Sequence, residues 1–334
     1  MAISDLNLAG LFAGVGGIEL GFQKAGFNPI FANEIDEKAS VTYRLNHSHD
    51  LITKDIKFLE AKELPKIDIL TGGFPCQAFS VAGYQKGFKD PRGNVFWEIV
   101  RLLEAKKPEI VFLENVKNLG SHDGGKTFRI ILQALETVGY HVKFEVLNSD
   151  GYGGVPQNRE RVYLVGFRSK KFARRFEFPG KLKKKPLLSD FIDFERRVED
   201  IFYYDDRYMA KELRKQMRRS DTVYQWRRQY VRENKSGVCP TLTANMGTGG
   251  HNVPLVLTKH GIRKLTPKEC FNLMGFPKSF KLPKEMAMSH LYKQAGNAVV
   301  VPVIERIAKN ILASVNGDEL PSVNRAKQLE IDAD

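Results

Sequence analysis

Short apolar runs separated by helical patterns occupy the first 167 residues, and this alternation constrains the fold more than any other feature. The clearest runs are Ile69–Leu70, Ile110–Leu113 and Val162–Gly166. Between them, residues 96–105 and 128–138 repeat apolar side chains at helical spacing, and Gly139 ends the second pattern. The alternation predicts an α/β fold: a mainly parallel, doubly wound sheet with helices on both faces. Ligands of such sheets bind beyond the carboxyl ends of the strands, so we expect a site in those loops.

Charge indicates a polyanionic partner. The chain carries 52 Lys and Arg against 39 Asp and Glu, a formal net charge of +13. Nucleic acid is the simplest partner for such a chain, although many basic proteins bind no polyanion. Two segments concentrate the charge. Residues 168–185 hold nine basic side chains and one Glu, and residues 207–235 hold ten basic and three acidic ones.

Cysteine content and hydropathy suggest a cytoplasmic protein without metal. The three cysteines, at 76, 239 and 270, have no metal-type spacing and suggest a reducing compartment. No apolar run approaches the roughly 18 residues of a membrane span. The amino terminus lacks the layout of a secretory signal. We therefore expect no metal, no membrane partner and a cytoplasmic location.

A glycine-rich turn, residues 12–17, stands between a short apolar start and a helical pattern from Ile18 to Ala25. Glycines in such a turn permit positive φ and let a ligand approach the backbone. Glu34 follows about 20 residues later, where an acid often holds ribose hydroxyls. Asp55 stands at the expected end of a third strand. Ordinary surface acids are the alternative, but turn and acids together favour an adenosine-type cofactor.

Four further residues suggest a reactive site. Cys76 lies in a loop beyond the strand at Ile69–Leu70, where a thiol would be accessible, although an unpaired cysteine is more often a buried apolar residue. Glu114 ends the strongest apolar run; desolvation there would favour the protonated carboxyl, suited to donating a proton. Arg159 and Arg161 precede another strand, and alternation predicts that they share one strand face. A structural salt bridge would explain Glu114 or either arginine taken singly. Together, the acid and the two arginines could surround a polar planar ring and its phosphate.

In this order the blocks resemble those of the bacterial DNA cytosine-5 methyltransferases of type II restriction–modification systems, over nearly the whole chain. The blocks are Phe12–Gly17, Pro75–Gln77, Glu114–Val116, Gln157–Arg161, Arg263–Cys270 and Gly296–Val300. The resemblance implies methyl transfer from S-adenosylmethionine, with S-adenosylhomocysteine as product, to carbon 5 of cytosine in a short duplex DNA sequence. It also implies protection of host DNA from a cognate restriction enzyme, by a monomer that need not contact that enzyme.

The resemblance also assigns roles. Cys76 would attack carbon 6 of a flipped cytosine, and Glu114 would protonate or hydrogen-bond ring nitrogen 3 and the exocyclic amine. Arg161 would hold the cytosine oxygen, and Arg159 would support the site or a phosphate. The implied cofactor residues are Phe12, Ala13, Gly14, Gly16, Gly17, Glu34, Ile35, Asp55, Ile56, Pro75, Val95, Asn297 and Ala298. The implied DNA-binding residues are Gln77, Ser80, Arg92, Arg227, Arg228, Arg232 and Thr241, most of the arginines on phosphates rather than base edges.

Two departures from the family pattern are visible. Gly10 occupies a position where many members carry Asp, so another acid would have to compensate. Ile35 stands where an aromatic residue is frequent, so adenine packing would be aliphatic. The resemblance divides the chain into a catalytic and cofactor domain (1–180), a target-recognition domain (181–275), a return to the catalytic domain (276–320) and a polar tail (321–334).

Two rivals remain at this stage. One is an RNA cytosine methyltransferase on the same fold, against which the large basic insert with Thr241-Leu242 argues. The other is a DNA-binding protein that has lost catalysis, against which the joint presence of Cys76, Glu114 and Arg161 argues.

Overall fold

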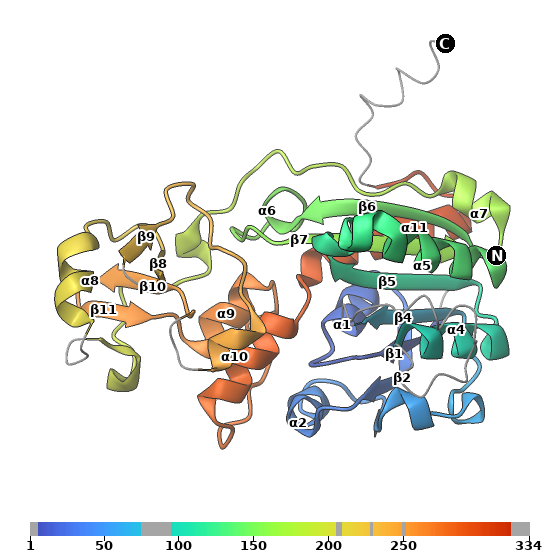
Figure 1. Cartoon of the computed structure of the whole chain (residues 1–334), viewed down its shortest axis with the longest axis horizontal. Coiled ribbons are helices and arrows are strands. Elements are labelled where there is room, and N and C mark those ends of the chain that lie inside the picture. The colour runs from blue at the N-terminus through green and yellow to red at the C-terminus, as the bar shows by residue number, and fades with distance from the viewer. Residues whose placement is uncertain (1–5, 75–94, 205–208, 228–229, 249–251, 322–334) are drawn as a thin grey trace, which may run out of the picture. The chain divides into compact units, whose positions relative to one another are not determined.

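The computed structural model describes residues 6–74, 95–204, 209–227, 230–248 and 252–321. The chain divides into two compact units (Figure 1). The first comprises Met1–Leu147, Glu160–Lys181 and Val303–Asp334; the second comprises Asn148–Arg159 and Leu182–Pro302. Residues 276–302 thus group with the second unit. The target-recognition boundaries remain a prediction, because compactness does not define what a segment recognises.

A seven-stranded sheet in the order β3-β2-β1-β4-β5-β7-β6 forms the centre of the first unit. Strands β3, β2, β1, β4 and β5 pair in parallel, and β7 pairs antiparallel with β5. The strands are β1 Asn7–Leu11, β2 Asn28–Glu34, β3 Asp50–Thr53, β4 Ile69–Gly73, β5 Ile110–Val116, β6 His141–Asn148 and β7 Glu160–Phe167. The mainly parallel sheet predicted from the alternation is therefore confirmed.

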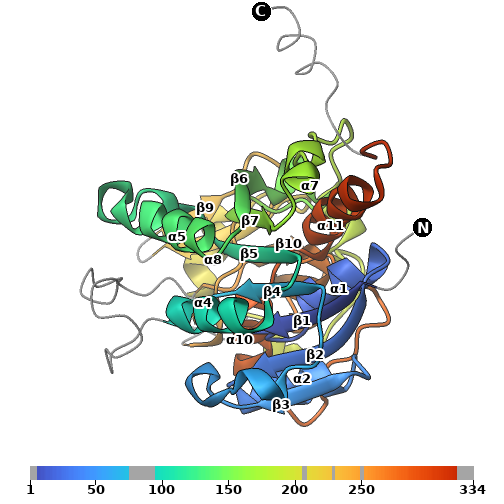
Figure 2. The same ribbon diagram turned by 90° about the vertical axis from the view of Figure 1, so that its right-hand side faces the viewer.

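Helices cover both faces of this sheet. Figure 2 shows α4 and α5 on one side of it and α1 and α11 on the other. The helices of this unit are α1 Gly17–Lys24, α2 Glu37–Arg44, α4 Val95–Lys106, α5 Lys126–Thr137, α7 Lys170–Arg175 and α11 Val301–Asn316, the last beginning two residues before the unit boundary. The predicted helices at 18–25, 96–105 and 128–138 are all present.

Each face has its own apolar packing. On one side, buried Ile99 of α4 and Ile131 of α5 join the core formed by Leu70 and Val111. On the other, Phe22 of α1 meets Phe112 of β5 edge-on at 5.1 Å between centroids. Burial of such side chains contributes about 1.5–3 kcal/mol each. The two layers hold the carboxyl ends of β1, β2, β4 and β5 in one row, which is where the predicted site residues lie.

The second unit contains a four-stranded sheet in the order β11-β10-β8-β9, with antiparallel pairs throughout. Buried Arg263 bonds both oxygens of Glu269, at 2.8 and 2.7 Å, and the carbonyl of Asp193. The elements are α6 Ser149–Tyr152, α8 Ala210–Gln216, β8 Tyr224–Arg227, β9 Tyr230–Glu233, β10 Leu255–Thr258, β11 Gly261–Lys264, α9 Pro267–Leu273 and α10 Met288–Asn297.

Candidate active site

The glycine-rich turn after β1 has the backbone that its sequence predicts. Gly14 and Gly16 have φ of 57° and 85°, and Phe12 adopts a positive φ of 54°. Positive φ is strained for a non-glycine residue and persists only where its surroundings hold it. A Cβ built on Gly14 would meet nothing within 4 Å. The turn therefore presents open space in front of its backbone at Gly14.

Glu34 joins this turn to the end of β2. Its Oε2 accepts the Gly14 N–H at 2.7 Å, and its Oε1 accepts the N–H groups of Ile35 and Asp36. The Lys54 N–H donates to the Glu34 carbonyl, which brings the segment carrying Asp55 alongside. Fixed in this way, the carboxylate stands at the carboxyl edge of the sheet, as the spacing predicted.

The neighbouring predicted residues differ in exposure. Ile35 is 60% exposed, whereas Ile56 is buried, and Asp55 caps the short 3-10 turn Ile56–Phe58 through the Lys57 N–H. An open glycine backbone, a fixed acid and an uncovered aliphatic side chain fit a nucleoside-type cofactor. Phe12 and Val95 are half-buried and pack against the main core.

Glu114 and Arg161 form an ion pair near the end of β5. Arg161 Nε lies 3.0 Å from Glu114 Oε1, and the two side chains are only 13% and 11% exposed. Arg161 pairs in register with Val116, two residues beyond Glu114, so both side chains are on the same face. Glu114 thus has a cationic partner at the end of the strand, and its role as a proton donor remains a prediction.

Asn115 fixes the chain that leads toward Cys76. Its buried Nδ2 donates to the Phe74 carbonyl at 2.8 Å, and its Oδ1 accepts the Val116 N–H. Gly73 is in register with Glu114, and a Cβ there would approach Glu114 Oε2 to 3.4 Å. Cys76 follows two residues after Phe74 and lies outside the described residues, as do Pro75, Gln77, Ser80 and Arg92.

Arg159 differs from the prediction that it shares a strand face with Arg161. β7 begins at Glu160, so Arg159 precedes the strand, belongs to the second unit and is only 2% exposed. Its guanidinium donates to the carbonyls of Leu242, Gly296 and Ala298, at 2.6, 3.0 and 2.7 Å. These bonds commit the side chain to the backbone of its own unit, because strand alternation does not extend past the strand.

Asn297 and Ala298 stand at the end of α10, in the second unit. Asn297 is exposed, and the Ala298 carbonyl is one of those that Arg159 binds. A Cβ on Gly296 would lie 2.2 Å from the Thr243 carbonyl carbon, so only glycine fits there. The Thr241 hydroxyl donates to the Asn158 carbonyl at 2.5 Å, which adds an internal role to its predicted DNA contact.

The hairpin β8–β9 displays basic side chains on one face. Gln225 is paired with Arg232, and Arg227 with Tyr230, so these four residues point to the same side. Arg227 and Arg232 are exposed, and so is Tyr230, at 55%. Tyr224 and Trp226 point the other way, into the core of the unit. Arg228 lies outside the described residues.

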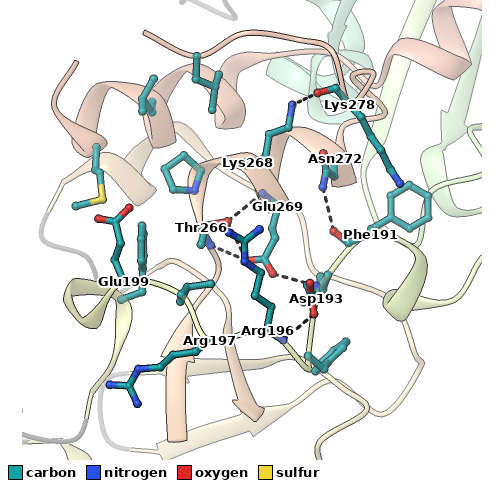
Figure 3. A pocket seen from close by; sticks show the side chains of 18 of the residues that line it. Phe191, Asp193, Arg196, Arg197, Glu199, Thr266, Lys268, Glu269, Asn272 and Lys278 are labelled. Atoms are coloured by element: carbon teal, nitrogen blue, oxygen red, sulfur yellow. Dashed lines mark hydrogen bonds between the residues drawn. The ribbon is translucent and has the colours of Figure 1, made fainter. Parts of the chain in front are cut away.

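A hollow of about 1210 Å³ occurs within the second unit (Figure 3). Around it, Glu269 accepts from the backbone of Asp193 and Thr266, and Lys268 donates to the Lys278 carbonyl. Its acids and bases are mixed, and none of the predicted site residues lines it. The hollow therefore adds nothing to the catalytic assignment.

The two described cysteines are structural. Cys239 and Cys270 are buried, and burial raises the pKa of each thiol above its ordinary value. Within the described ranges, no group of three or more His, Cys, Asp or Glu could hold a metal ion. No helix among those residues is long and apolar enough to cross a membrane.

Two residues of this region were not singled out from the sequence. Asn115 entered the sequence analysis only as part of the Glu114–Val116 block. Its position as a polar residue inside a buried strand could have indicated that it holds another segment, as it does at Phe74. Glu19 lies within the predicted helix from Ile18 to Ala25, and the structure buries it fully. Its burial had no local sequence signal, because it depends on the space above Gly10.

The glycine turn, the fixed acid and the buried Glu114–Arg161 pair all lie at the carboxyl edge of the sheet, where folds of this class bind their ligands. Residues 6–313 match the family described as C-5 cytosine-specific DNA methylase, and the chain belongs to that family. It is a DNA (cytosine-5-)-methyltransferase, a class whose methyl donor is S-adenosylmethionine and whose substrate is duplex DNA.

Sequence relatives are type II methyltransferases of restriction–modification systems. The chain is 56% identical over 314 residues to M.Bsp6I of Bacillus sp. (strain RFL6), covering 93% of this chain and 99% of the relative. It is 36% identical to M.HhaI of Haemophilus parahaemolyticus, covering 94% and 96%. In fold it is similar to a DNMT2 mutant of Spodoptera frugiperda, with a TM-score of 0.72, 21% identity and coverage of 92% and 99%.

Proposed function

We propose that this enzyme methylates carbon 5 of a cytosine in one short duplex DNA sequence, through a covalent bond between Cys76 and carbon 6. The observation that carries the proposal is the Glu114–Arg161 pair beside Gly73. A carboxyl and a guanidinium there can form hydrogen bonds to neighbouring polar groups along one edge of a cytosine. The chain leads from this edge, through the anchored Phe74, toward the nucleophile.

The chemistry follows from the ring's poor reactivity. Cys76 Sγ, as thiolate, forms a bond to carbon 6 while Glu114 donates to or holds ring nitrogen 3 and the exocyclic amine. Arg161 holds the carbonyl oxygen of the cytosine, and the displaced electron pair makes carbon 5 nucleophilic. S-adenosylmethionine supplies the methyl group. Loss of the carbon-5 proton to a water then restores the double bond and expels the Cys76 thiolate.

For the cofactor, we assign the turn backbone and Phe12 to the methionine and adenine sides, and Glu34 to the ribose. The open space at Gly14 and the anchored Glu34 carboxylate support this. The remaining proposed contacts are Ala13, Gly16, Gly17, Ile35, Asp55, Ile56, Pro75, Val95, Asn297 and Ala298. No metal is required, because the sulfonium is already an activated leaving group.

Two residues act by positioning. Arg159 holds three carbonyls of the second unit and so shapes the backbone around Leu242 and Ala298. Asn115 fixes the Phe74 carbonyl and with it the start of the Cys76 loop. Neither side chain needs to touch the cytosine to affect the rate, since small displacements of a nucleophile are costly.

The target base must leave the helix to meet Cys76. We assign duplex binding to the exposed hairpin face carrying Arg227 and Arg232, mainly through phosphates. The further proposed DNA contacts are Gln77, Ser80, Arg92, Arg228 and Thr241. Acting as a monomer on bacterial DNA in the cytoplasm, the enzyme would block cleavage by a cognate nuclease without contacting it.

Trapping on DNA that contains 5-fluorocytosine tests the adduct, because fluorine prevents the final elimination. With cofactor present, the wild type should give a complex that survives denaturing electrophoresis, and Cys76→Ser should give none while still binding DNA. Cys239→Ala, which removes a buried thiol, is the matched control and should trap. A wild type that binds duplex DNA but never traps would contradict the mechanism, and trapping on tRNA alone would move the substrate to RNA.

A further inference from the structure

Glu19, in the first turn of α1, is a buried acid without a visible partner. Its side chain is 0% exposed. In the part of the chain that the structure describes, neither carboxyl oxygen has a hydrogen-bond partner. A buried carboxyl without a hydrogen-bond partner destabilises the folded chain, because it loses its hydration and gains nothing in return. The position therefore calls for a function that the protein side chains alone do not supply.

The carboxyl fills space that Gly10 leaves in β1. A Cβ on Gly10 would lie 1.8 Å from Glu19 Oε1. Gly10 is in register with Thr71 of β4, whose side chain is also fully buried. Among the described residues, the Thr71 hydroxyl likewise lacks a partner. Two polar groups without partners thus share one sheet face, directly before the glycine-rich turn.

Electrostatics around Glu19 favour the neutral acid. Burial raises the pKa of Glu19 to about 8, and the charge of Glu34 reinforces this rise. Tyr43 of α2 lies close enough for the charge of Glu19 to affect its pKa, and the rings of His47 and His49 pack against the Tyr43 ring. Burial lowers the pKa of both histidines, so neither supplies a positive charge near neutral pH.

We propose that Glu19 is a buried countercharge for the cationic cofactor, and that cofactor binding releases a proton from its carboxyl. S-adenosylmethionine carries a sulfonium and an ammonium. Placed near the glycine turn, these charges favour the carboxylate, so the O–H bond of Glu19 breaks and the proton passes to solvent. Glu19 would thereby serve as the acid that position 10 lacks. The inference rests on the proposed use of the glycine turn by S-adenosylmethionine.

Titration calorimetry of the full chain with S-adenosylmethionine tests this at pH 6.5. Two buffers of different ionisation enthalpy report the protons exchanged. The wild type should release about one proton per cofactor bound, as linkage requires of a group that is protonated only in the free state. Glu19→Gln should release almost none and bind about tenfold more weakly. Glu37→Gln, an exposed acid in the first turn of α2, is the matched control and should behave as wild type.

A double variant distinguishes the effect of the buried negative charge from the effect of the Glu19 side chain on packing. The double variant Gly10→Asp with Glu19→Ala returns a carboxyl to the same space from the strand side. It should recover proton release and most of the affinity. Wild type and Glu19→Gln that bind alike, with equal proton release, would overturn the inference while leaving the cofactor assignment intact. A wild type that does not bind S-adenosylmethionine at all would refute the proposed function first.

Discussion

Replacing Arg159 by methionine decides whether this arginine is a catalytic group or holds the second unit together. The change removes donors to three carbonyls at 2.6–3.0 Å, and the residue is only 2% exposed. An unsatisfied buried polar group costs about 1–3 kcal/mol. Allowing for partial relaxation, we expect the second unit to lose roughly 3–5 kcal/mol, a large share of ordinary stability.

The two tryptophans make the assay specific. Trp97 lies in α4 of the first unit and Trp226 in β8 of the second. In a Trp97→Phe background, fluorescence during urea unfolding reports the second unit alone. With a slope of about 2 kcal/mol per molar urea, the midpoint should fall by roughly 1.5–2.5 M. Arg159→Lys should recover little, since one ammonium cannot span three acceptors.

Arg161→Met is the control for this experiment. Arg161 belongs to the first unit and pairs with Glu114. Its loss should therefore abolish methyl transfer but leave the urea midpoint reported by Trp226 fluorescence unchanged. An Arg159→Met protein with an unchanged midpoint and no activity would show that Arg159 acts on the substrate. The structural role argued from its three carbonyls would then be wrong.

Three other perturbations give expected outcomes. Glu114→Gln should lower the rate of labelled methyl transfer at least about 100-fold while DNA affinity changes little, because it removes a proton donor; an unchanged rate would exclude Glu114 from the chemistry. Glu19→Gln should stabilise the cofactor-free protein. Folding raises the pKa of Glu19 from 4.5 to about 8, so the folded wild type loses stability as the pH rises between these two values. The loss is absent below pH 4.5 and reaches about 5 kcal/mol at pH 8. The gain in thermal midpoint should therefore be larger at pH 8 than at pH 5, and a gain independent of pH would contradict the burial argument. Arg227→Ala and Arg232→Ala should each reduce the salt dependence of DNA binding by about 0.9 in log–log slope if they meet phosphates; an unchanged slope with relaxed sequence preference would instead indicate base contacts.

Much of the fold could be predicted from local sequence, and so could the position of several candidate site residues at the edge of the sheet. The alternation of apolar runs and helical patterns gave the parallel sheet, because strand and helix periods are local properties. Glycines at 14 and 16 indicated a turn with positive φ, and the distance to Glu34 placed an acid beside it. Glu114 was found because a carboxyl at the end of a buried strand needs a partner or a function.

The remaining assignments depended on contacts between distant segments. Arg159 and Arg161 are two residues apart and looked equivalent, yet the start of β7 at Glu160 separates them. Arg159 donates to carbonyls 83 to 139 residues away in sequence, whereas Arg161 forms an ion pair with Glu114. Glu19 gave no signal, because its burial arises from a missing side chain at Gly10 on the strand beneath it. Sequence by itself determined which chemical groups stand at the sheet edge, since strand ends and turns are encoded locally. Only the tertiary structure decided which of them are buried and which partner each one meets, since desolvation and pairing depend on the residues that folding brings together.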